Sequence, residues 1–483
     1  MTVIGRRRLL GLAAGAAVLG GAPRWAQGQP SGTAPLSALG TDPPEPGIKL
    51  RFWTTERGAD RVTVIRYLLD VQAAFAGQPP VVIETVAEED VVARLRAAHD
   101  PASRIPIPHL VNTGADTLLA LDTLGLLSRD GHRVVQTLGD ATFETGALAA
   151  LRRPDGRLAA IPFHGWPQIV WARRDWLADS LGQPVPQTVD ALRRAAHRLH
   201  DPAAGRRGII LGTTGDFYTQ QCFMMIARAY GAGTVGPDGA PQLDTPAMVA
   251  ALEAYADLAR AAGPGALTWR ARDYYLQGRA AFLVYSTFLM DDLAVPAVAQ
   301  DSLTGAHFPD LDGAPFDPLL VEKTAPIATL GGAAPGAIGA FSSINGLGLT
   351  GVGDPAERLA ARSLALFLFR RDAYIAWLHM APGGMIPLVR GILETDAFMR
   401  DRLGVFRAFG RDVTRRFGAA LRVPSTASTV VAEAAGRPYA DPRAGLLYAE
   451  RVLGRMVARV LAGETAPRAA ARAAQAEARA LLE

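Results

Sequence analysis

The regular alternation of strand-like and helix-like segments after residue 47 most strongly constrains the fold of this chain. Residues 48–52 alternate apolar and polar side chains, residues 80–86 contain three consecutive β-branched residues, and residues 107–111 are a third predicted strand, closed by Asn112-Thr113-Gly114. Apolar residues at helical spacing follow each of these runs. This order of strand, helix, strand, helix and strand predicts a βαβαβ unit built on a parallel sheet.

A second α/β stretch begins near Asp155. Residues 157–163, 168–172 and 208–211 are predicted strands, and residues 188–200 form a predicted helix. Another helix is predicted to begin at Thr245-Pro246, where a capping hydroxyl precedes a proline in the first turn. We therefore assign the chain to the α/β class. Its 483 residues are enough for two or three hydrophobic cores.

The N-terminus has the layout of an export signal. Three arginines at 6–8 precede the apolar run 9–21, which is too short to span a bilayer, and small residues follow near Ala26. We predict a cleaved signal peptide over residues 1–28. The paired arginines favour twin-arginine export, and the Sec route stays open because Gly5 stands where Ser or Thr is commoner.

The segment after this signal predicts a tether and an unlipidated product. Residues 29–47 are rich in proline and are predicted to be a linker. No cysteine stands at the end of the signal to carry a lipid. We therefore expect a soluble periplasmic protein.

Charge and cysteine usage narrow the class of partner. The chain has 50 Lys+Arg against 46 Asp+Glu, and the four arginines of residues 1–28 account for the difference. A balanced remainder gives no reason to expect nucleic acid or an anionic membrane surface as partner. Cys222 is the only cysteine, which excludes a disulfide within the chain, and its apolar helical surroundings predict a buried thiol.

Motifs of common enzymes are absent or misplaced. Residues 231–236 spell Gly-x-Gly-x-x-Gly but follow a predicted helix instead of a strand, which argues against dinucleotide binding. The only lysines, Lys49 and Lys323, do not follow a Gly-rich loop, and no Gly-x-Ser-x-Gly or His-Glu-x-x-His occurs. His197 and His200 share a helix face without an evident third ligand. We predict no catalysis, metal or cofactor, although paired carboxylates of a glycoside hydrolase remain open because their separation is a three-dimensional property.

Six segments resemble one family, and they occur in its order along the chain. They are Arg51-Phe52-Trp53-Thr54, residues 155–162 with 171–175, residues 278–286, Gly346-Leu347-Gly348-Leu349, Gly383-Gly384-Met385-Ile386-Pro387, and residues 461–465. Together they resemble the extracellular solute-binding proteins of ABC importers, in the carbohydrate-binding group that includes maltose-binding protein.

The resemblance implies two doubly wound α/β lobes joined by three hinge crossings, the type II periplasmic-binding-protein fold. The crossings are expected near residues 159–163, 282–286 and 344–349. The expected N-terminal lobe is 48–158 plus 287–343, and the expected C-terminal lobe is 159–286 plus 344–483. In such a fold the cleft between the lobes closes on its ligand by hinge motion.

Ligands of doubly wound sheets meet the carboxyl ends of the strands. A sugar needs aromatic surfaces for its C–H face and polar groups for its hydroxyls. On these grounds the candidate ligand-binding residues are Trp53, Thr54, Glu56, Asn112, Thr113, Gly114, His164, Trp166, Tyr285, Ser286, Phe341, Ser342 and Ser343, with Asn345 a similar case.

Core packing remains an equal alternative for Trp53 and Trp166, a solvated loop carboxylate an alternative for Glu56, and a polar core position an alternative for His164. We expect Trp171, Trp176 and Trp377 to pack in the structure, and we leave Trp269 undecided.

The sequence thus predicts the substrate-binding component of an ABC transporter. It would capture a small polar solute, a sugar or sugar derivative, and deliver it as a monomer to permease subunits at the inner membrane. Two alternatives remain open at this point: a periplasmic hydrolase or lyase acting on glycans, and a ligand receptor without transport.

Overall fold

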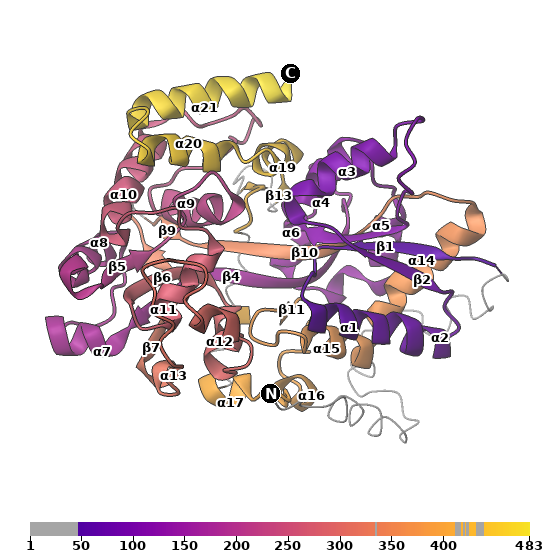
Figure 1. Cartoon of the computed structure of the whole chain (residues 1–483). Coiled ribbons are helices and arrows are strands. Elements are labelled where there is room, and N and C mark those ends of the chain that lie inside the picture. The colour runs from indigo at the N-terminus through magenta and orange to yellow at the C-terminus, as the bar shows by residue number, and fades with distance from the viewer. Residues whose placement is uncertain (1–46, 334–335, 411–416, 419–420, 422–424, 431–438) are drawn as a thin grey trace.

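The computed structural model describes residues 47–333, 336–410, 417–418, 421, 425–430 and 439–483 (Figure 1). The predicted signal peptide and all of the predicted linker except Gly47 lie outside the described residues. Within the described part of the chain, no helix has the length and apolarity needed to cross a membrane.

A single mixed sheet runs through the molecule. Its strand order is β2-β1-β3-β10-β4-β6-β5. The bounds are β1 Leu50–Thr54, β2 Val81–Thr85, β3 Leu110–Gly114, β4 Ile161–Arg173, β5 Arg207–Ile210, β6 Ala280–Ser286 and β10 Phe341–Leu349. The strands β1, β2 and β3 pair in parallel, which confirms the predicted βαβαβ unit. The strands β5 and β6 are also parallel, whereas β10 and β4 are antiparallel to their neighbours.

Short strands complete the sheet and form two small additional ones. Strands β7 (Thr324–Ile327) and β11 (Ile386–Pro387) pair with β4. The strands β8 (Leu330–Gly331) and β9 (Ile338–Gly339) pair with each other, as do β12 (Thr429–Val430) and β13 (Tyr439–Ala440).

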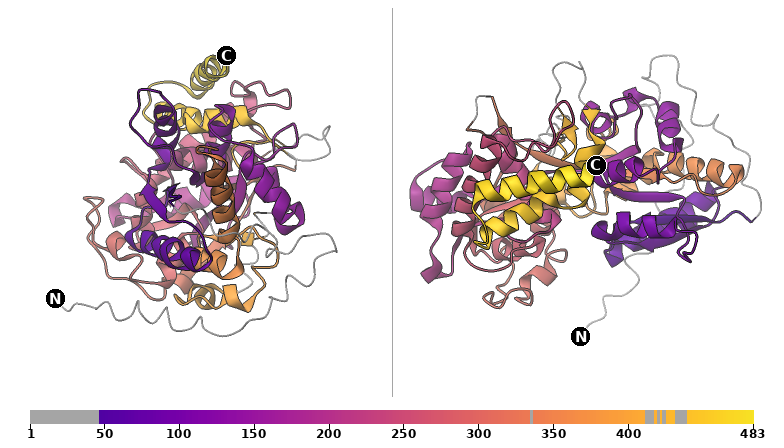
Figure 2. Two further views of the ribbon diagram at one scale, coloured as in Figure 1. Left: turned by 90° about the vertical axis from the view of Figure 1, so that its right-hand side faces the viewer. Right: turned by 90° about the horizontal axis from the view of Figure 1, so that it is seen from above.

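The helices gather in two halves, towards the two ends of the long strands β4 and β10, as Figure 1 shows and as the right-hand view of Figure 2 repeats from above. The first half holds α1 Ala59–Tyr67, α2 Ala73–Phe75, α3 Val91–Ala98, α4 Ala115–Thr123, α5 Asp130–Leu138, α6 Thr145–Ala149, α14 Pro355–Leu368, α15 Arg371–Leu378 and α16 Asp396–Met399. The second half holds α7 Arg174–Trp176, α8 Val189–Leu199, α9 Phe217–Ala229, α10 Pro246–Ala262, α11 Arg272–Leu276, α12 Leu289–Ala294, α13 Leu320–Lys323, α17 Val405–Phe409, α20 Val452–Leu461 and α21 Pro467–Leu482.

Helix α19 (Pro442–Ala449) links the two halves above the sheet. It packs on α4 of the first half. Its Tyr448 carbonyl accepts a hydrogen bond from Gln220 Nε2 of α9 (3.0 Å), and its Tyr448 hydroxyl accepts one from Gln221 Nε2 (2.9 Å).

Local sequence signals explain several helix starts. Thr245 caps α10 through a bond from the Met248 amide, and Pro246 occupies the first turn, as predicted. Asp354 and Glu357 form a reciprocal capping box at the start of α14. The Gly-x-Gly-x-x-Gly segment follows α9, as expected, and not a strand.

The structure divides the chain differently from the expected lobe boundaries. Residues 289–327 were expected in the N-terminal lobe, but they contact the second half: Asp310 pairs with Arg207 (3.0 Å), and β7 pairs with residues 170–173 of β4. Conversely, α14 was expected in the C-terminal lobe, and it packs on α5 and β1 of the first half.

The crossings account for this difference. The strand β4 pairs with β10 through its first residues and with β6 through residues 168–172, so it passes from one half to the other. The strand β10 makes the second passage, because residues 345–349 also pair with β3. The expected crossing at 282–286 lies within β6, inside the second half. The chain leaves the first half again between α16 and α17, since α17 packs on α12.

An irregularity interrupts the pairing of β4 with β10. Asn345 lies opposite His164 and Gly346 lies opposite Pro162, so Phe163 is an extra residue in β4. A Cβ atom at Gly346 would approach the Ile161 carbonyl oxygen to 2.8 Å, which explains the glycine of this motif. The Phe163 ring packs against Phe369 and Trp377, with ring centroids 5.3 and 5.1 Å away. The bulge therefore anchors β4 in the first half before the strand crosses.

Candidate functional site

A cavity of about 340 Å³ lies where the two halves meet, and we call it the inner chamber. The first half contributes the ends of β1 and β3 and the starts of α1 and α4. The second half contributes α9 and the end of β6, while β4, β10 and α19 reach the chamber between them. Aromatic side chains of the second half, of β4 and of α19 line it: Trp166, Phe217, Tyr218, Trp269, Tyr285, Phe288 and Tyr448.

Six of the thirteen predicted ligand-binding residues line the inner chamber. They are Glu56, Gly114, Trp166, Tyr285, Ser286 and Ser343, and Asn345 lines it as well. They come from the loop after β1 and from β3, β4, β6 and β10, which lie far apart in the sequence. The structure thus brings together the strand ends that were expected to meet.

The other predicted residues are buried around the chamber. Trp53 is 1% exposed, and the Arg94 guanidinium lies over its ring at 5.0 Å from the centroid. The Thr54 hydroxyl donates to Asn112 Oδ1 (3.2 Å), and Asn112 Nδ2 donates to the Gly346 carbonyl oxygen (3.1 Å). These two bonds tie β1, β3 and β10 together, so the side chains of Thr54 and Asn112 support the chamber from behind.

Phe341 and Ser342 of β10 also lie outside the lining. The Phe341 ring lies against Trp166, with centroids 6.1 Å apart. The Ser342 hydroxyl is 2.6 Å from the hydroxyl of Ser425. Phe341 therefore supports the Trp166 ring, which itself faces the chamber.

His164 is fully buried in β4, opposite Asn345. Neither ring nitrogen has a hydrogen-bond partner within the described residues. Burial lowers the pKa of His164 to about 4, so its ring is neutral at physiological pH. The ring is thus a buried core group, although it lacks the hydrogen-bond partners that a satisfied polar core residue would have among the described residues.

Two carboxyl groups that the sequence reasoning missed lie on the first-half wall. Glu88 accepts hydrogen bonds from the hydroxyls of Thr113 (2.8 Å) and Thr117 (2.7 Å) and from the Gly114 amide (3.3 Å). Asp116 accepts from the Ser428 amide (2.8 Å) and the Ser428 hydroxyl. Burial raises the pKa of both carboxyls. Each carboxyl group lies within a few residues of the carboxyl end of a strand, and this position in the sequence could have identified both as candidates.

Glu56 and Arg61 form a charged pair in the wall of the inner chamber. Glu56 is 5% exposed, and its Oε2 lies 2.6 Å from Arg61 Nη1. The Arg61 guanidinium also lies over the Phe288 ring of the second half, 4.9 Å from the centroid. Arg61 therefore bridges the two halves through an ion pair on one side and a cation–π contact on the other.

A larger cavity of about 840 Å³ adjoins the inner chamber, and we call it the outer chamber. The two share Arg61, Trp269, Tyr285 and Phe288 in their walls. The rest of the outer chamber comes from Gly58, Arg270 and Arg272, from α12, and from the segment 297–304.

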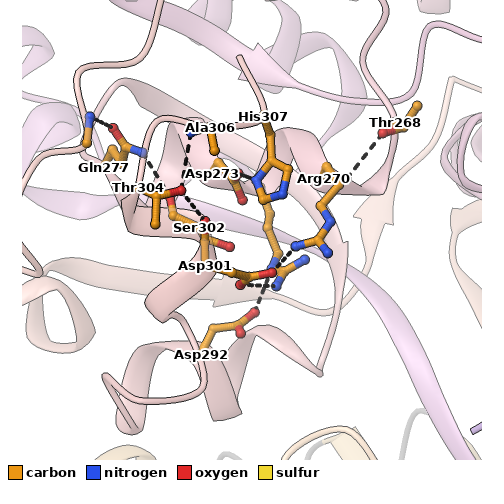
Figure 3. Close-up of polar contacts among 12 residues, drawn as sticks. Thr268, Arg270, Asp273, Gln277, Asp292, Asp301, Ser302, Thr304, Ala306 and His307 are labelled. Atoms are coloured by element: carbon orange, nitrogen blue, oxygen red, sulfur yellow. Dashed lines mark hydrogen bonds and ion pairs between the residues drawn. The ribbon is translucent and has the colours of Figure 1, made fainter. Parts of the chain in front are cut away.

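Ion pairs organise the outer chamber. Arg272 Nε lies 2.9 Å from Asp292 Oδ2, and Arg270 pairs with Asp301 (Figure 3). The Asp291 carboxylate accepts from the amides of Gly383 and Gly384, both at 3.0 Å. Burial raises the pKa of Asp291 to about 7 and that of Asp292 to about 6. Asp291 lies in α12 of the second half and the two glycines follow α15 of the first, so these bonds also join the halves.

The remaining notable side chains lie away from both chambers. Trp171 and Trp377 are fully buried, which confirms the expected packing. Cys222 is also buried, as predicted, and burial raises the pKa of its thiol to about 12. Trp176 lies between the guanidinium groups of Arg173 (4.8 Å) and Arg206 (5.0 Å).

Comparisons with known proteins agree with this architecture. Residues 127–341 match the family model of the bacterial extracellular solute-binding proteins. The Escherichia coli (strain K12) protein YcjN, a proposed ABC transporter periplasmic-binding protein, is 26% identical over 292 residues, which are 60% of this chain. That match spans 62% of the length of YcjN.

Solved structures share the fold over most of the chain. An ABC transporter solute-binding protein from Agrobacterium radiobacter K84, in complex with ribitol, matches with a TM-score of 0.67 and 21% identity, over 91% of this chain and 100% of that one. Maltose-bound MalE3 of T. maritima matches with a TM-score of 0.63 and 17% identity, over 90% and 99% of the two chains. The chain is therefore similar to the bacterial extracellular solute-binding proteins over residues 127–341, and it shares the fold of the two solved structures over most of its length.

Proposed function

We propose that this protein captures a small hydroxylated solute, a sugar or a polyol, in the inner chamber and delivers it to the permease of an ABC importer. The observation that carries the proposal is the composition of this chamber. Aromatic rings of the second half, β4 and α19 line it together with polar and charged side chains of the first half, at the place where β4 and β10 cross between the halves.

The chemistry of the walls suits a solute with many hydroxyl groups. A sugar ring presents C–H groups to an aromatic face and hydroxyls around its rim. Trp166 and Tyr285 offer aromatic faces, whereas Gln168, Ser343 and Asn345 offer donors and acceptors. The ribitol and maltose of the two related structures are ligands of this kind.

Closure of the halves would complete the capture. The only sheet strands that pass between the halves in the described part of the chain are β4 and β10, so bending there would move one wall towards the other. A closed, loaded form is the state that we expect the permease subunits to recognise. We propose that the protein acts as a monomer.

A thermal-shift and calorimetry screen of sugars and polyols tests this function. A ligand at about 100 times its dissociation constant stabilises the folded state by about 2.7 kcal/mol, which a melting curve detects. Binding of at least one sugar or polyol, with one site per chain, is the expected result. If no member of a broad panel shifts the melting temperature, the proposed solute class is wrong.

The alternative of a periplasmic hydrolase or lyase predicts turnover. Glu88 and Asp116 are the carboxyl groups that such an enzyme would have to use in catalysis. We expect both to act only as hydrogen-bond acceptors, because hydroxyl and amide groups already donate to them. Incubation of the ligand from the screen with the protein, followed by chromatography, should return the ligand unchanged. Conversion of this ligand would favour the enzyme. Binding and signalling without a cognate permease would favour the receptor alternative.

We also propose export by the twin-arginine route. Arg6 and Arg7, followed by Arg8, precede the apolar run of the predicted signal. Replacing both by lysine keeps the charge and should leave the precursor in the cytoplasm, as fractionation and immunoblotting would show. Arg24→Lys, also within the signal, is the matched control. Normal export of the double variant would point to the Sec route.

A further inference from the structure

We propose that the outer chamber binds the second unit of an elongated solute, a glycan of at least two sugar units, and that Trp269 is the aromatic contact for this unit. This inference rests on the proposed function of the inner chamber. It adds a size class for the solute and a residue that selects for it.

The adjacency of the chambers is the first argument. Arg61, Trp269, Tyr285 and Phe288 line both, so the second unit of a solute held in the inner chamber would lie within reach of the outer one. The outer chamber is the larger of the two, at about 840 Å³ against about 340 Å³. A solute of one sugar unit would leave it empty.

The exposure of apolar side chains is the second argument. Trp269 is 42% exposed and Val298 is 43% exposed, and both line the outer chamber. Both belong to the small group of large apolar side chains that stay exposed in the described chain. Exposed apolar surface in the wall of a polar cavity is typical of a ligand contact.

The fixed orientation of the Trp269 ring is the third argument. The guanidinium groups of Arg270 and Arg272 lie 4.3 and 5.0 Å from its centroid. Arg272 is 6% exposed and is held by Asp292, while Arg270 is held by Asp301 (Figure 3). The ring is therefore ordered before any ligand arrives, which lowers the entropic cost of binding.

The polar rim of the outer chamber fits hydroxyl groups. Asp292, Asp301, Gln300 and Thr304 place acceptors and donors around the exposed Trp269 ring. An aromatic face surrounded by carboxylates, an amide and a hydroxyl is the same combination that lines the inner chamber. We infer that a second sugar unit stacks on Trp269 and hydrogen-bonds to this rim.

Length ladders of neutral sugars test the inference. Isothermal titration calorimetry would compare glucose with maltose and maltotriose, glucose with cellobiose and cellotriose, and xylose with xylobiose and xylotriose, with ribitol and mannitol as short polyols. In the ladder that binds, the two-unit sugar should bind about tenfold or more tightly than its one-unit member. Because Trp269 lines both chambers, Trp269→Ala should remove this advantage by weakening the two-unit sugar about tenfold more than the one-unit sugar.

Trp176→Ala is the matched control, since this ring also lies between two arginines but lines neither chamber. Val298→Glu is a second variant that narrows the outer chamber without changing Trp269, and it should weaken only the longer sugars because Val298 lines the outer chamber and not the inner one. Equal affinity for one-unit and two-unit sugars would overturn the inference, as would an equal loss for both in Trp269→Ala. If none of the ladders or polyols binds, the proposed function fails, and the inference fails with it.

Discussion

The end of β1 and the middle of β4 each carry a tryptophan close to the inner chamber, but the two rings have different surroundings. Trp53 of β1 is 1% exposed, with the Arg94 guanidinium on its face. Trp166 of β4 is half-buried and lines the chamber, with Phe341 behind it. Proximity to the cleft in the fold is therefore not enough to give a ring access to ligand.

The pairing of the two strands explains the difference. The strand β1 lies between β2 and β3 in regular parallel register, and helices cover both of its faces. Phe52 packs against Trp377 of α15 on one side, and Trp53 lies under Arg94 of α3 on the other. The strand β4 instead carries an extra residue at Phe163 and crosses between the halves, so its central side chains face the space between them.

Truncation of Trp53 should produce the largest effect. Replacing a buried tryptophan by alanine costs about 3–5 kcal/mol of unfolding free energy, so Trp53→Ala should unfold at much lower denaturant concentration. The affinity for the sugar found in the screen should stay the same in the fraction that remains folded. A variant of normal stability with weakened binding would show that the Trp53 ring contacts ligand after all. Trp176→Ala, a half-buried ring outside both chambers, is the control for general tryptophan effects.

The buried imidazole next to the bulge in β4 should make stability depend on pH. The pKa of His164 is lowered from 6.5 to about 4 in the folded state, so the unfolded chain binds the proton more tightly. The stability that comes from the neutral ring is therefore present above pH 6.5 and is lost as the pH falls towards 4. Relative to His164→Leu, the wild-type protein should lose about 3 kcal/mol between pH 7 and pH 4.

Asp291 provides a control of opposite sign for that measurement. Its pKa is raised to about 7 in the folded state, so the folded protein binds the proton more tightly than the unfolded chain. Relative to Asp291→Asn, the wild-type protein should therefore gain stability as the pH falls from 7 towards 4. Urea unfolding at several pH values separates the two contributions. Parallel profiles of wild type and His164→Leu would contradict the assigned neutral histidine.

Truncation of Trp166 should have a smaller effect, and it should fall on binding. Loss of an aromatic anchor from a ligand site costs on the order of 2 kcal/mol, which is about thirtyfold in affinity. Because Trp166 already contacts the open chamber, Trp166→Ala should keep most of its stability. Calorimetry with the sugar from the screen measures the affinity, and Phe341→Leu tests whether the ring needs its support. Unchanged affinity in Trp166→Ala would remove this ring from the ligand site.

Local patterns predicted the elements better than their assembly. Alternation and helical spacing identified β1, β2 and β3, and Thr245-Pro246 marked the start of α10. The lobe boundaries could not be read in this way, because they depend on β10 pairing with both β3 and β4 across more than 150 residues of chain. The alternation of β1 correctly placed Phe52 and Trp53 on opposite faces, but it cannot show that both faces are covered.

The candidate site was predictable to a similar degree. The strand-end rule located Glu56, Gly114, Tyr285 and Ser286 at the chamber because carboxyl ends of neighbouring strands meet at one edge. It missed Glu88 and Asp116, which lie just beyond the strand ends in the first helical turns that follow. It also missed Trp269, because the segment ahead of α11 reaches the cleft only through packing of the second half.

Removal of the charge above Trp53 should produce the smallest effect of the series. A cation over an aromatic face contributes about 0.5–1 kcal/mol at a partly exposed site, so Arg94→Met should lower the unfolding free energy by that amount and leave ligand affinity unchanged. Arg94 also pairs with Glu84, and Glu84→Gln removes the ion pair while keeping the guanidinium on the ring. The loss of unfolding free energy in Arg94→Met should therefore exceed that in Glu84→Gln.

A double-mutant cycle with Trp53→Leu measures the contribution of the ring. In the Trp53→Leu background, the loss caused by Arg94→Met should fall to the loss that comes from the ion pair alone. An effect of Arg94→Met that persists in full without the ring would show that the guanidinium does not act on Trp53. A change of sugar affinity in Arg94→Met would show that the face of β1 with Trp53 takes part in ligand binding.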